Sequence, residues 1–575
     1  MLTRKKFILP FTILLGIFLG FLPFSSEIHA AGTDVDAEYR DPNEAGAGYQ
    51  LVIFKDKSPS SGFSYLMNGS PENLCGSLGD VKCAGGNSLG YSAIIPSCST
   101  PNQLDCIVEF GTANDTDIKT LGAFVGTFPT VGRNQFVGDS AVKLPSGGAP
   151  TLWNLASLPH AGGTTYMVQV QSRGQMQGGS FLLADFNIEI QPIELVADVC
   201  IPNQGSGAQC EENSGPGYYD VPISAIEYDE NGSELPRETK VGNASRVSMT
   251  TFDCVILAED KCARRHAFPS GTRLYIKVRL SQTPTGWLHG RISQPTVTLT
   301  PLSGTAVELA VSAAAVNTPV IAQAQPFSTL PADLQQAYQA TGGFNGGNAG
   351  TRNRPTFTST PDIRNAISQP SSSSATGMDE LLMWLPHIND TATANIGTWT
   401  VRSLSAGELT GATSCFVNST QLNGLVMTNA TQYSAGPPLF DKAAGSLEYK
   451  VAAPHYTSGG NVFTGTYDLI MRSDVARCLY GFSKAPLNAS ISVLDNDGVA
   501  TVATKLVSEK DGWLRIYAYG FGFSNPTIKV NLTQAESPTT KKVVAKKTTI
   551  TCKKGKTVKK VTAIKPVCPK GFKKA

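Results

Sequence analysis

Strict alternation of side-chain types is clearest in one stretch near the end of the chain, Trp513 to Phe523. Its odd positions carry aromatic side chains and Arg515, and its even positions carry Leu, Ile, Ala and Gly. A period of two places these sets on opposite faces of a β-strand. The pattern therefore predicts a strand with one aromatic face and one face of smaller side chains.

Short alternating runs, separated by Gly, Pro, Asn and Ser, recur along most of the chain. The 56 Gly, the 35 Pro and the low share of charged residues, 16%, are typical of an all-β protein. Because 575 residues exceed what one core can organise, we expect tandem β-sandwich, immunoglobulin-like modules. The predicted organisation is a signal peptide (1–30), a first β module (32–196), a second β module (197–302), a linker with short helices (303–395), a third, β-sandwich module (396–535) and a lysine-rich tail (536–575).

The linker is predicted because the alternating pattern typical of β-strands stops in residues 303–395. An Ala- and Val-rich stretch leads to Pro331 and Ala332, where proline in the first turn favours a helix start, and Gly342 favours its end. A second short helix is expected from Met378 to Leu385, before Pro386. We expect two small helices on a linker rather than a separate domain.

Two parts of the chain share a frame. Gly286-Trp287-Leu288 is followed by Pro295 and an alternating run, and Gly512-Trp513-Leu514 is followed by Pro526 and a similar run. The frame predicts a strand opened by Gly-Trp-Leu, a turn containing proline and an alternating final strand.

The N-terminus has the features of a secretory signal peptide. Arg4 to Lys6 are basic, an apolar run extends to Phe24, and Ala30 offers a small residue for cleavage. The alternative is an uncleaved anchor, because the run approaches the roughly 20 residues of a spanning helix. Pro10 shortens that run, so cleavage is favoured. We expect a secreted, extracellular or cell-surface protein with no membrane span after cleavage.

All twelve cysteines follow this segment, and their even number fits disulfides formed in an oxidising compartment. Metal binding is the alternative, but no C-x-x-C pair and no neighbouring histidine pair exists, so we expect no metal and no cofactor. Closure between neighbouring cysteines is the simplest pairing. It predicts Cys75–Cys83, Cys98–Cys106, Cys200–Cys210, Cys254–Cys262, Cys415–Cys478 and Cys552–Cys568.

Charge is distributed very unevenly. Residues 541–575 contain thirteen Lys and no Asp or Glu, whereas residues 1–540 carry 34 basic and 45 acidic side chains, a net charge of −11. Such a tail attracts an anionic cell-envelope polymer or glycan, wall teichoic acid for example, in a salt-dependent way. The alternative is a solvated tail that only maintains solubility. Nucleic acid is not expected as a partner of an exported chain. The candidate binding residues are Lys553, Lys554, Lys556, Lys559 and Lys560.

The aromatic positions Trp513, Tyr517 and Tyr519 are a second candidate binding site. Flat rings in a row on one strand can stack on sugar faces, but the same rings can fill a sandwich core, and the core arrangement is favoured.

Motifs for catalysis and for calcium are weak. Gly86 to Gly90 fits G-x-S-x-G around Ser88, but a nucleophile elbow needs a strand before it and a helix after it, and here a strand follows. Asp495 and Asp497 could offer oxygen ligands to calcium, yet the later glutamate of an EF-hand is absent, so a turn is favoured. We predict no catalytic residue.

The Gly-Trp-Leu frame and the tail segments 550–556 and 566–574 resemble large, uncharacterised secreted β-repeat proteins of actinobacteria with a Lys-rich, two-cysteine C-terminal tail. The resemblance implies an exported surface protein and transfers no catalytic or binding residue. We therefore expect a non-catalytic secreted or cell-surface β protein, structural or adhesive, held at an anionic envelope by its basic tail. A carbohydrate-binding protein that uses the aromatic strand, and an extracellular hydrolase, are the alternatives.

Overall fold

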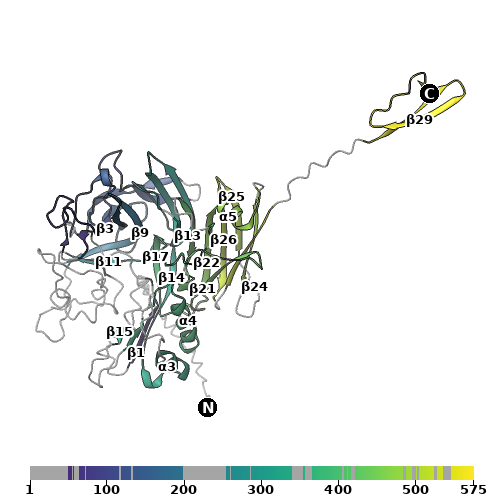
Figure 1. Cartoon of the computed structure of the whole chain (residues 1–575). Coiled ribbons are helices and arrows are strands. Elements are labelled where there is room, and N and C mark those ends of the chain that lie inside the picture. Colours follow the sequence, from purple (N-terminus) through teal and green to yellow (C-terminus); the bar gives the residue numbers. More distant parts are fainter. Residues whose placement is uncertain are drawn as a thin grey trace, which may run out of the picture.

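The structure is a computed structural model, and it is mostly β with a few short helices (Figure 1). It describes residues 49–54, 56, 64–70, 73–114, 118–130, 134–197, 254–258, 261–284, 286–339, 354–355, 366–368, 370–404, 407–410, 412, 414–415, 421–434, 436–483, 487–494, 500–501, 504–523, 527–534 and 546–575.

Twenty-one strands are joined by pairing into one large sheet. They are β1 (Tyr49–Phe54), β2 (Tyr65–Asn68), β3 (Leu89–Ile94), β4 (Cys106–Ala113), β5 (Lys119–Leu121), β6 (Ala123–Thr127), β7 (Thr151–Asn154), β8 (Thr165–Gln177), β9 (Ser180–Ala197), β10 (Cys254–Ala258), β11 (Lys261–Arg265), β12 (Arg273–Leu280), β13 (Gly286–Pro301), β14 (Val307–Pro326), β15 (Arg354–Pro355), β16 (Ala366–Ser368), β17 (Ala394–Ser403), β18 (Leu422–Thr428), β22 (Thr464–Arg472), β25 (Thr504–Lys510) and β26 (Trp513–Gly522).

The part of the chain that the structure describes also contains two smaller sheets. The six-stranded sheet contains β19 (Gln432–Tyr433), β20 (Leu439–Asp441), β21 (Ser446–Ala452), β23 (Leu487–Leu494), β24 (Ala500–Thr501) and β27 (Thr527–Gln534). The three-stranded sheet contains β28 (Thr548–Lys554), β29 (Thr557–Ala563) and β30 (Lys573–Lys574).

Long strands exchange partners along their length. The first part of β13 pairs with β17 and, in parallel, with β18, and its second part pairs with β14. The register shifts between Ser293 and Thr296, and Gln294 there has a φ of 51°. A β-bulge of this kind bends a strand without ending it. The proline turn predicted after Gly286-Trp287-Leu288 is therefore wrong, because this segment is one bulged strand.

The stretch expected as a linker contains the longest strand found in the described residues. The 20 residues of β14 pair in turn with β12, β13, β17 and β1. Most of its side chains are buried on both faces. A strand covered on both faces shows no alternation of polar and apolar positions, so the sequence did not reveal it.

Both short helices expected in this stretch are present. They are α3 (Ala332–Gln339) and α4 (Ala375–Trp384), and the Ser374 side chain caps α4 by accepting from the Gly377 N–H. Their apolar side chains form a helical core with β1 that includes Val52, Phe54 and Leu381. A third helix, α5 (Ser473–Tyr480), follows β22, and the short 3-10 helices are η2 (Ser140–Val142), η5 (Phe327–Thr329) and η6 (Leu385–Ile388).

The three predicted β modules share a core. One cluster, the central core, joins Phe110 from the first module to Ile276 from the second and Trp399 from the third. Strand pairing agrees, because β17 pairs with both β9 and β13. The modules are therefore parts of one connected β structure.

A second cluster, the C-terminal core, lies between two sheets. Val426, Leu469 and Ile516 come from the large sheet, and Leu447 and Val530 come from the six-stranded sheet. Side chains of the two sheets therefore share one apolar cluster, and the β-sandwich module predicted for residues 396–535 stays a prediction.

Four disulfides are present, and they are those expected from spacing. They join Cys75 to Cys83, Cys98 to Cys106, Cys415 to Cys478 and Cys552 to Cys568. The pair Cys200–Cys210, the side chains of Cys254 and Cys262, and the signal segment lie outside the described residues. Within the described part of the chain, no helix is both long enough and apolar enough to cross a membrane.

Candidate functional site

The lysine-rich tail folds as a small antiparallel hairpin with a third, short strand. β28 and β29 are joined by the two-residue loop Gly555-Lys556, and Gly555 has a φ of 59°. A hairpin loop of this length favours glycine at a position with positive φ. β30 pairs with the other edge of β28, and the Cys552–Cys568 disulfide ties the returning chain to the central strand.

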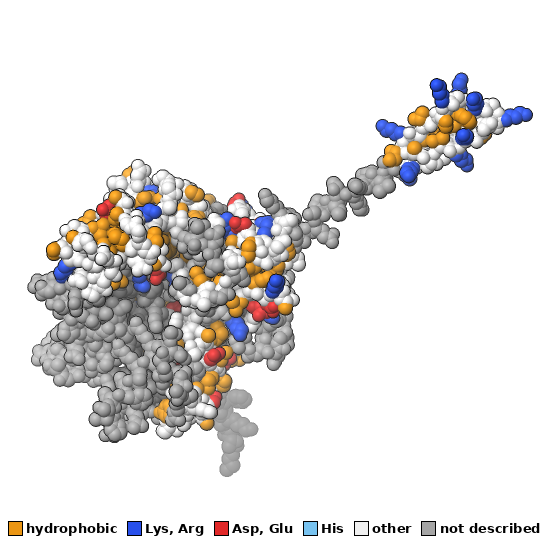
Figure 2. Space-filling model, in the orientation of Figure 1, with side chains coloured by type: hydrophobic (Ala, Val, Ile, Leu, Met, Phe, Trp, Pro, Cys, Tyr) orange, Lys and Arg blue, Asp and Glu red, His pale blue; other side chains and the backbone are white. Residues whose placement is uncertain are grey.

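The predicted lysines lie on both faces of this hairpin and in its loop. Lys554 and Lys559 share the face of Cys552, Lys553 and Lys560 lie on the opposite face, and Lys556 lies in the loop. All five are exposed, and Figure 2 shows lysine side chains projecting from the hairpin in several directions.

All charged side chains of the hairpin are positive. Residues 546–575 contain no Asp or Glu, so their lysines have no carboxylate side chain within the hairpin to pair with. Lys553 lies directly opposite Lys573 across the β28–β30 ladder. Like charges in directly opposed positions destabilise a sheet, so an anion bound outside the hairpin would relieve this repulsion.

The aromatic strand predicted at Trp513 is β26, and it is covered on both faces. It pairs with β22 on one edge and β25 on the other. Trp513, Tyr517 and Tyr519 pack against the central core. Tyr517 is only 8% exposed, and its hydroxyl donates to the Pro295 carbonyl over 3.4 Å. Tyr517 therefore has the core arrangement that the sequence favoured.

The predicted single aromatic face is wrong at its far end. Phe521 and Phe523 belong to the C-terminal core, on the face of Leu514 and Ile516. The register against β22 shifts at this point, and Gly520 has a φ of 74°. The bulge at Gly520 adds one residue and so exchanges the two faces.

Asp468 on β22 is a buried carboxyl group beside these rings that the sequence analysis missed. It accepts hydrogen bonds from the Tyr519 hydroxyl and, over 3.1 Å, from the Gln294 N–H. Burial raises its pKa to about 7, although these hydrogen bonds work to lower it. An acidic residue inside an otherwise apolar strand was the available signal.

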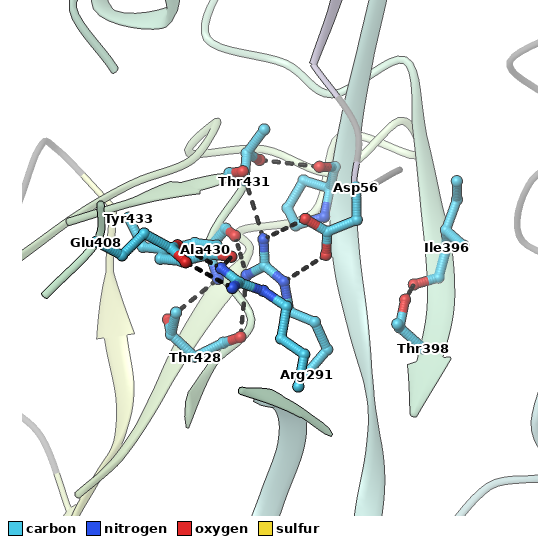
Figure 3. A network of polar contacts seen from close by, with 11 residues as sticks. Asp56, Arg291, Ile396, Thr398, Glu408, Thr428, Ala430, Thr431 and Tyr433 are labelled. Carbon is cyan, nitrogen blue, oxygen red and sulfur yellow. Dashed lines mark hydrogen bonds and ion pairs between the residues drawn. The ribbon is translucent and has the colours of Figure 1, made fainter. Parts of the chain in front are cut away.

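A buried polar network surrounds Arg291 of β13, whose side chain is 2% exposed (Figure 3). Its Nε lies 2.5 Å from Oδ2 of Asp56, and its Nη2 lies 3.0 Å from Oδ1. It also donates to the carbonyls of Thr428, over 3.0 Å, and Ala430, and its guanidinium lies 4.7 Å from the centre of the Tyr433 ring. A buried cation is tolerated only with such complete pairing.

Neighbouring groups extend this network. His289 stacks on Tyr433 at 3.9 Å, and Arg402 pairs with Glu408 at 2.7 Å and donates to the Tyr433 hydroxyl. Burial, together with the charges of Arg402 and Arg291, holds the pKa of His289 well below its usual value, so this imidazole is neutral. Burial works to raise the pKa of Asp56, but the Arg291 charge outweighs it and lowers that pKa.

The Arg291 network joins segments that are far apart in sequence. It connects Asp56, two residues after β1, to β13 and to the end of β18 with the loop that follows. Its charged groups are paired with one another and with backbone carbonyls, which suits a clamp that holds the strands together. No short motif could predict it, because Arg291 and Asp56 are 235 residues apart.

Histidines that are distant in sequence also meet. The rings of His160 and His266 lie 5.4 Å apart, and Nε2 of His266 lies 3.2 Å from Oε2 of Glu194. Burial is the largest cause that lowers the pKa of both histidines. In the described residues, no group of three or more His, Cys, Asp or Glu side chains could hold a metal ion. Asp495 and Asp497 lie outside those residues.

Ser88 lies in an exposed bend immediately before β3. A strand follows it where a nucleophile elbow has a helix. The loop interpretation of this motif agrees with that geometry.

Comparison with protein-family models, curated proteins and solved structures finds no match to the chain.

Proposed function

We propose that the chain is a secreted or cell-surface, non-catalytic β protein, structural or adhesive, held at an anionic cell envelope by its C-terminal hairpin. The observation that carries the proposal is the ordered hairpin of residues 546–575, which has exposed lysines and no acidic side chain. The four disulfides fit folding in an oxidising compartment, and the N-terminal segment fits export.

Charge explains why the body needs such an element. Residues 1–540 carry a net charge of −11, so an anionic envelope repels them. The thirteen lysines of residues 541–575 reverse that interaction locally. Repulsion and attraction act in different parts of the molecule, so the hairpin contacts the envelope while the body extends away from it.

The folded structure of the tail favours a role in binding over a role in solubility alone. A solubilising tail can stay unfolded, because its lysines then lie farther apart. Here a disulfide and a three-stranded sheet hold them close together, at a cost in repulsion. Fixed cations bind a polyanion better than mobile ones, because they lose less conformational entropy on binding.

The direct test compares the full chain with a form that lacks residues 538–575, on isolated cell envelopes at low and high salt. We expect the full chain to be retained at low salt and released at high salt, because exposed charges more than about 10 Å apart are screened at 0.1 M salt. The shortened form should stay in solution under both conditions. Equal retention of the two forms would contradict the proposal.

A further inference from the structure

The strand register divides the hairpin into two faces that carry equal charge. Opposed residues in an antiparallel ladder share a face. One face, the disulfide face, carries Cys552 with Lys554, Lys559 and Lys574. The other, the open face, carries Lys553, Lys560 and Lys573 around Val558.

The disulfide face is covered by the chain that returns from β29 to β30. Cys568 bonds to Cys552 there, and the Lys559 ammonium lies 5.5 Å from the centre of the Phe572 ring. A Cβ placed on Gly571 would lie 3.3 Å from Nζ of Lys554. Two of the three lysines on this face are therefore engaged with the chain that covers it.

The open face has no such cover. Its central apolar side chain, Val558, is 54% exposed, and Lys553, Lys560 and Lys573 are all exposed. At one end of the same face, the hydroxyls of Thr549 and Thr562 lie 2.7 Å apart, which confirms that side chains of the two strands meet there. This face therefore presents ammonium and hydroxyl groups around one exposed apolar side chain.

We propose that the open face is the docking surface of the hairpin, and that its ligand is a linear phosphodiester polymer that lies across the three strands. The inference rests on the proposed function and adds which face binds and what chemistry it binds. Lys560, Lys553 and Lys573 come from β29, β28 and β30, and neighbouring strands lie about 4.8 Å apart. Lys573 lies directly opposite Lys553, and Lys560 is the diagonal neighbour of Lys553, about 7–8 Å away. Each neighbouring pair therefore lies within about one screening length, roughly 8 Å at physiological salt, and the three ammonium groups act together on successive charges of a polymer.

The tail carries its positive charge on lysine alone. Residues 541–575 contain no Arg, whose planar guanidinium matches carboxylate and phosphate groups alike with two parallel hydrogen bonds. Lysine acts as a point charge with three donors that rotate, which suits phosphate oxygens that arrive from different directions. Docking on this face also neutralises the opposed ammonium groups of Lys553 and Lys573.

Two triple variants with the same change of charge test the inference in the full, oxidised chain. The first, K553E/K560E/K573E, alters the open face, and the second, K554E/K559E/K574E, alters the disulfide face. Affinity is measured on immobilised poly(glycerol phosphate), with poly-glutamate and anionic phospholipid vesicles as comparison ligands. Formation of the Cys552–Cys568 bond, checked by mass spectrometry, and the milder K553Q/K560Q/K573Q variant guard against loss of the fold.

We expect the open-face variant to lose affinity for the phosphodiester polymer by about tenfold more than the disulfide-face variant, equivalent to about three lost ionic contacts of moderate strength. Equal losses would overturn the assignment of the face and leave the proposed function intact. No loss in either variant would overturn both. Tighter binding to poly-glutamate or to vesicles than to the phosphodiester polymer would overturn the assigned ligand chemistry.

Discussion

Side-chain types alternate along both strand β26 and the tail hairpin, but β26 is covered by other parts of the chain and the hairpin is partly exposed. β26 has a paired strand on each edge and an apolar core on each face. The hairpin has one face covered by its own disulfide-bonded chain and one face exposed. Alternation predicts which side chains share a face, but distant segments decide whether that face is covered. Binding is therefore expected where cover is missing.

The two regions also treat charge differently. In the body, Arg291 is buried and paired with Asp56, and Asp468 is buried with a pKa raised to about 7, mainly by desolvation. In the hairpin the charges are exposed and of one sign. Body charges therefore affect stability, whereas hairpin charges are available to a partner.

The largest contrast should come from truncating one apolar side chain in each region. Phe521→Ala removes a fully buried ring from β26, and we expect a loss of about 3–5 kcal/mol in the free energy of unfolding. Val558→Ala, the matched change on the open face, should cost less than about 0.5 kcal/mol. Denaturant unfolding of both variants measures the difference. Similar losses of stability in the two variants would contradict the claim that Phe521 is buried and Val558 is exposed.

Removing the tail disulfide should affect the hairpin alone. With C552S/C568S, we expect the hairpin to lose about 3 kcal/mol of stability, as predicted for a closed loop of this length. Amide hydrogen exchange in residues 546–563 should become fast, while the thermal unfolding of the body is unchanged. Unchanged protection of β28 and β29 would show that the small sheet does not depend on its disulfide.

A buried carboxyl group should make the stability of the body depend on pH. Glu380 on α4 is fully buried, and its carboxylate accepts from the Tyr338 hydroxyl at 2.6 Å and the Ser368 hydroxyl at 2.8 Å. Burial raises its pKa from 4.5 to about 7. The folded state then holds a proton that the unfolded state has lost, so stability falls as the pH rises from about 4.5 to about 7, by up to about 3 kcal/mol.

Glu380→Gln removes this contribution. The free energy of unfolding of the variant should decrease less with rising pH, and the variant should be more stable than the natural chain at pH 8. The decrease that remains is expected from Asp468, whose pKa is also raised. Thermal unfolding at pH 5, 6, 7 and 8 checks this, with Asp379→Asn on the same helix as the control. A natural chain whose stability rises over this range would contradict the account.

The smallest contrast between the two regions is expected at two glycines. Gly520 in β26 and Gly555 in the hairpin loop both have positive φ, and neither has an atom within 4 Å of an added Cβ. Replacing either with Ala should cost about 1 kcal/mol, from backbone strain alone. Denaturant unfolding measures the first and hydrogen exchange in the hairpin measures the second. A much larger cost at Gly520 would indicate a side-chain clash that the structure does not contain.

These two regions also show how far the sequence could predict the structure. The alternation predicted β26, and Pro331, Gly342 and Pro386 predicted the short helices. Cysteine spacing predicted the four disulfides found in the described residues. The bulge at Gly520 was missed, although glycine inside a strand is a signal for one. β14 and the Asp56–Arg291 pair were missed because burial on both faces removes periodicity and because their partners are distant in sequence.

The most direct test of the central claim is the dependence of affinity on salt. The dissociation constant of the oxidised full chain on poly(glycerol phosphate) is measured from about 50 to 500 mM salt, beside that of a chain ending at residue 537. The account predicts that affinity of the full chain falls steeply, by about tenfold or more over this range, as it does for polyanion binding through several lysines, and that the shorter chain does not bind. An affinity that does not change with salt, or equal affinity of the two chains, would contradict it.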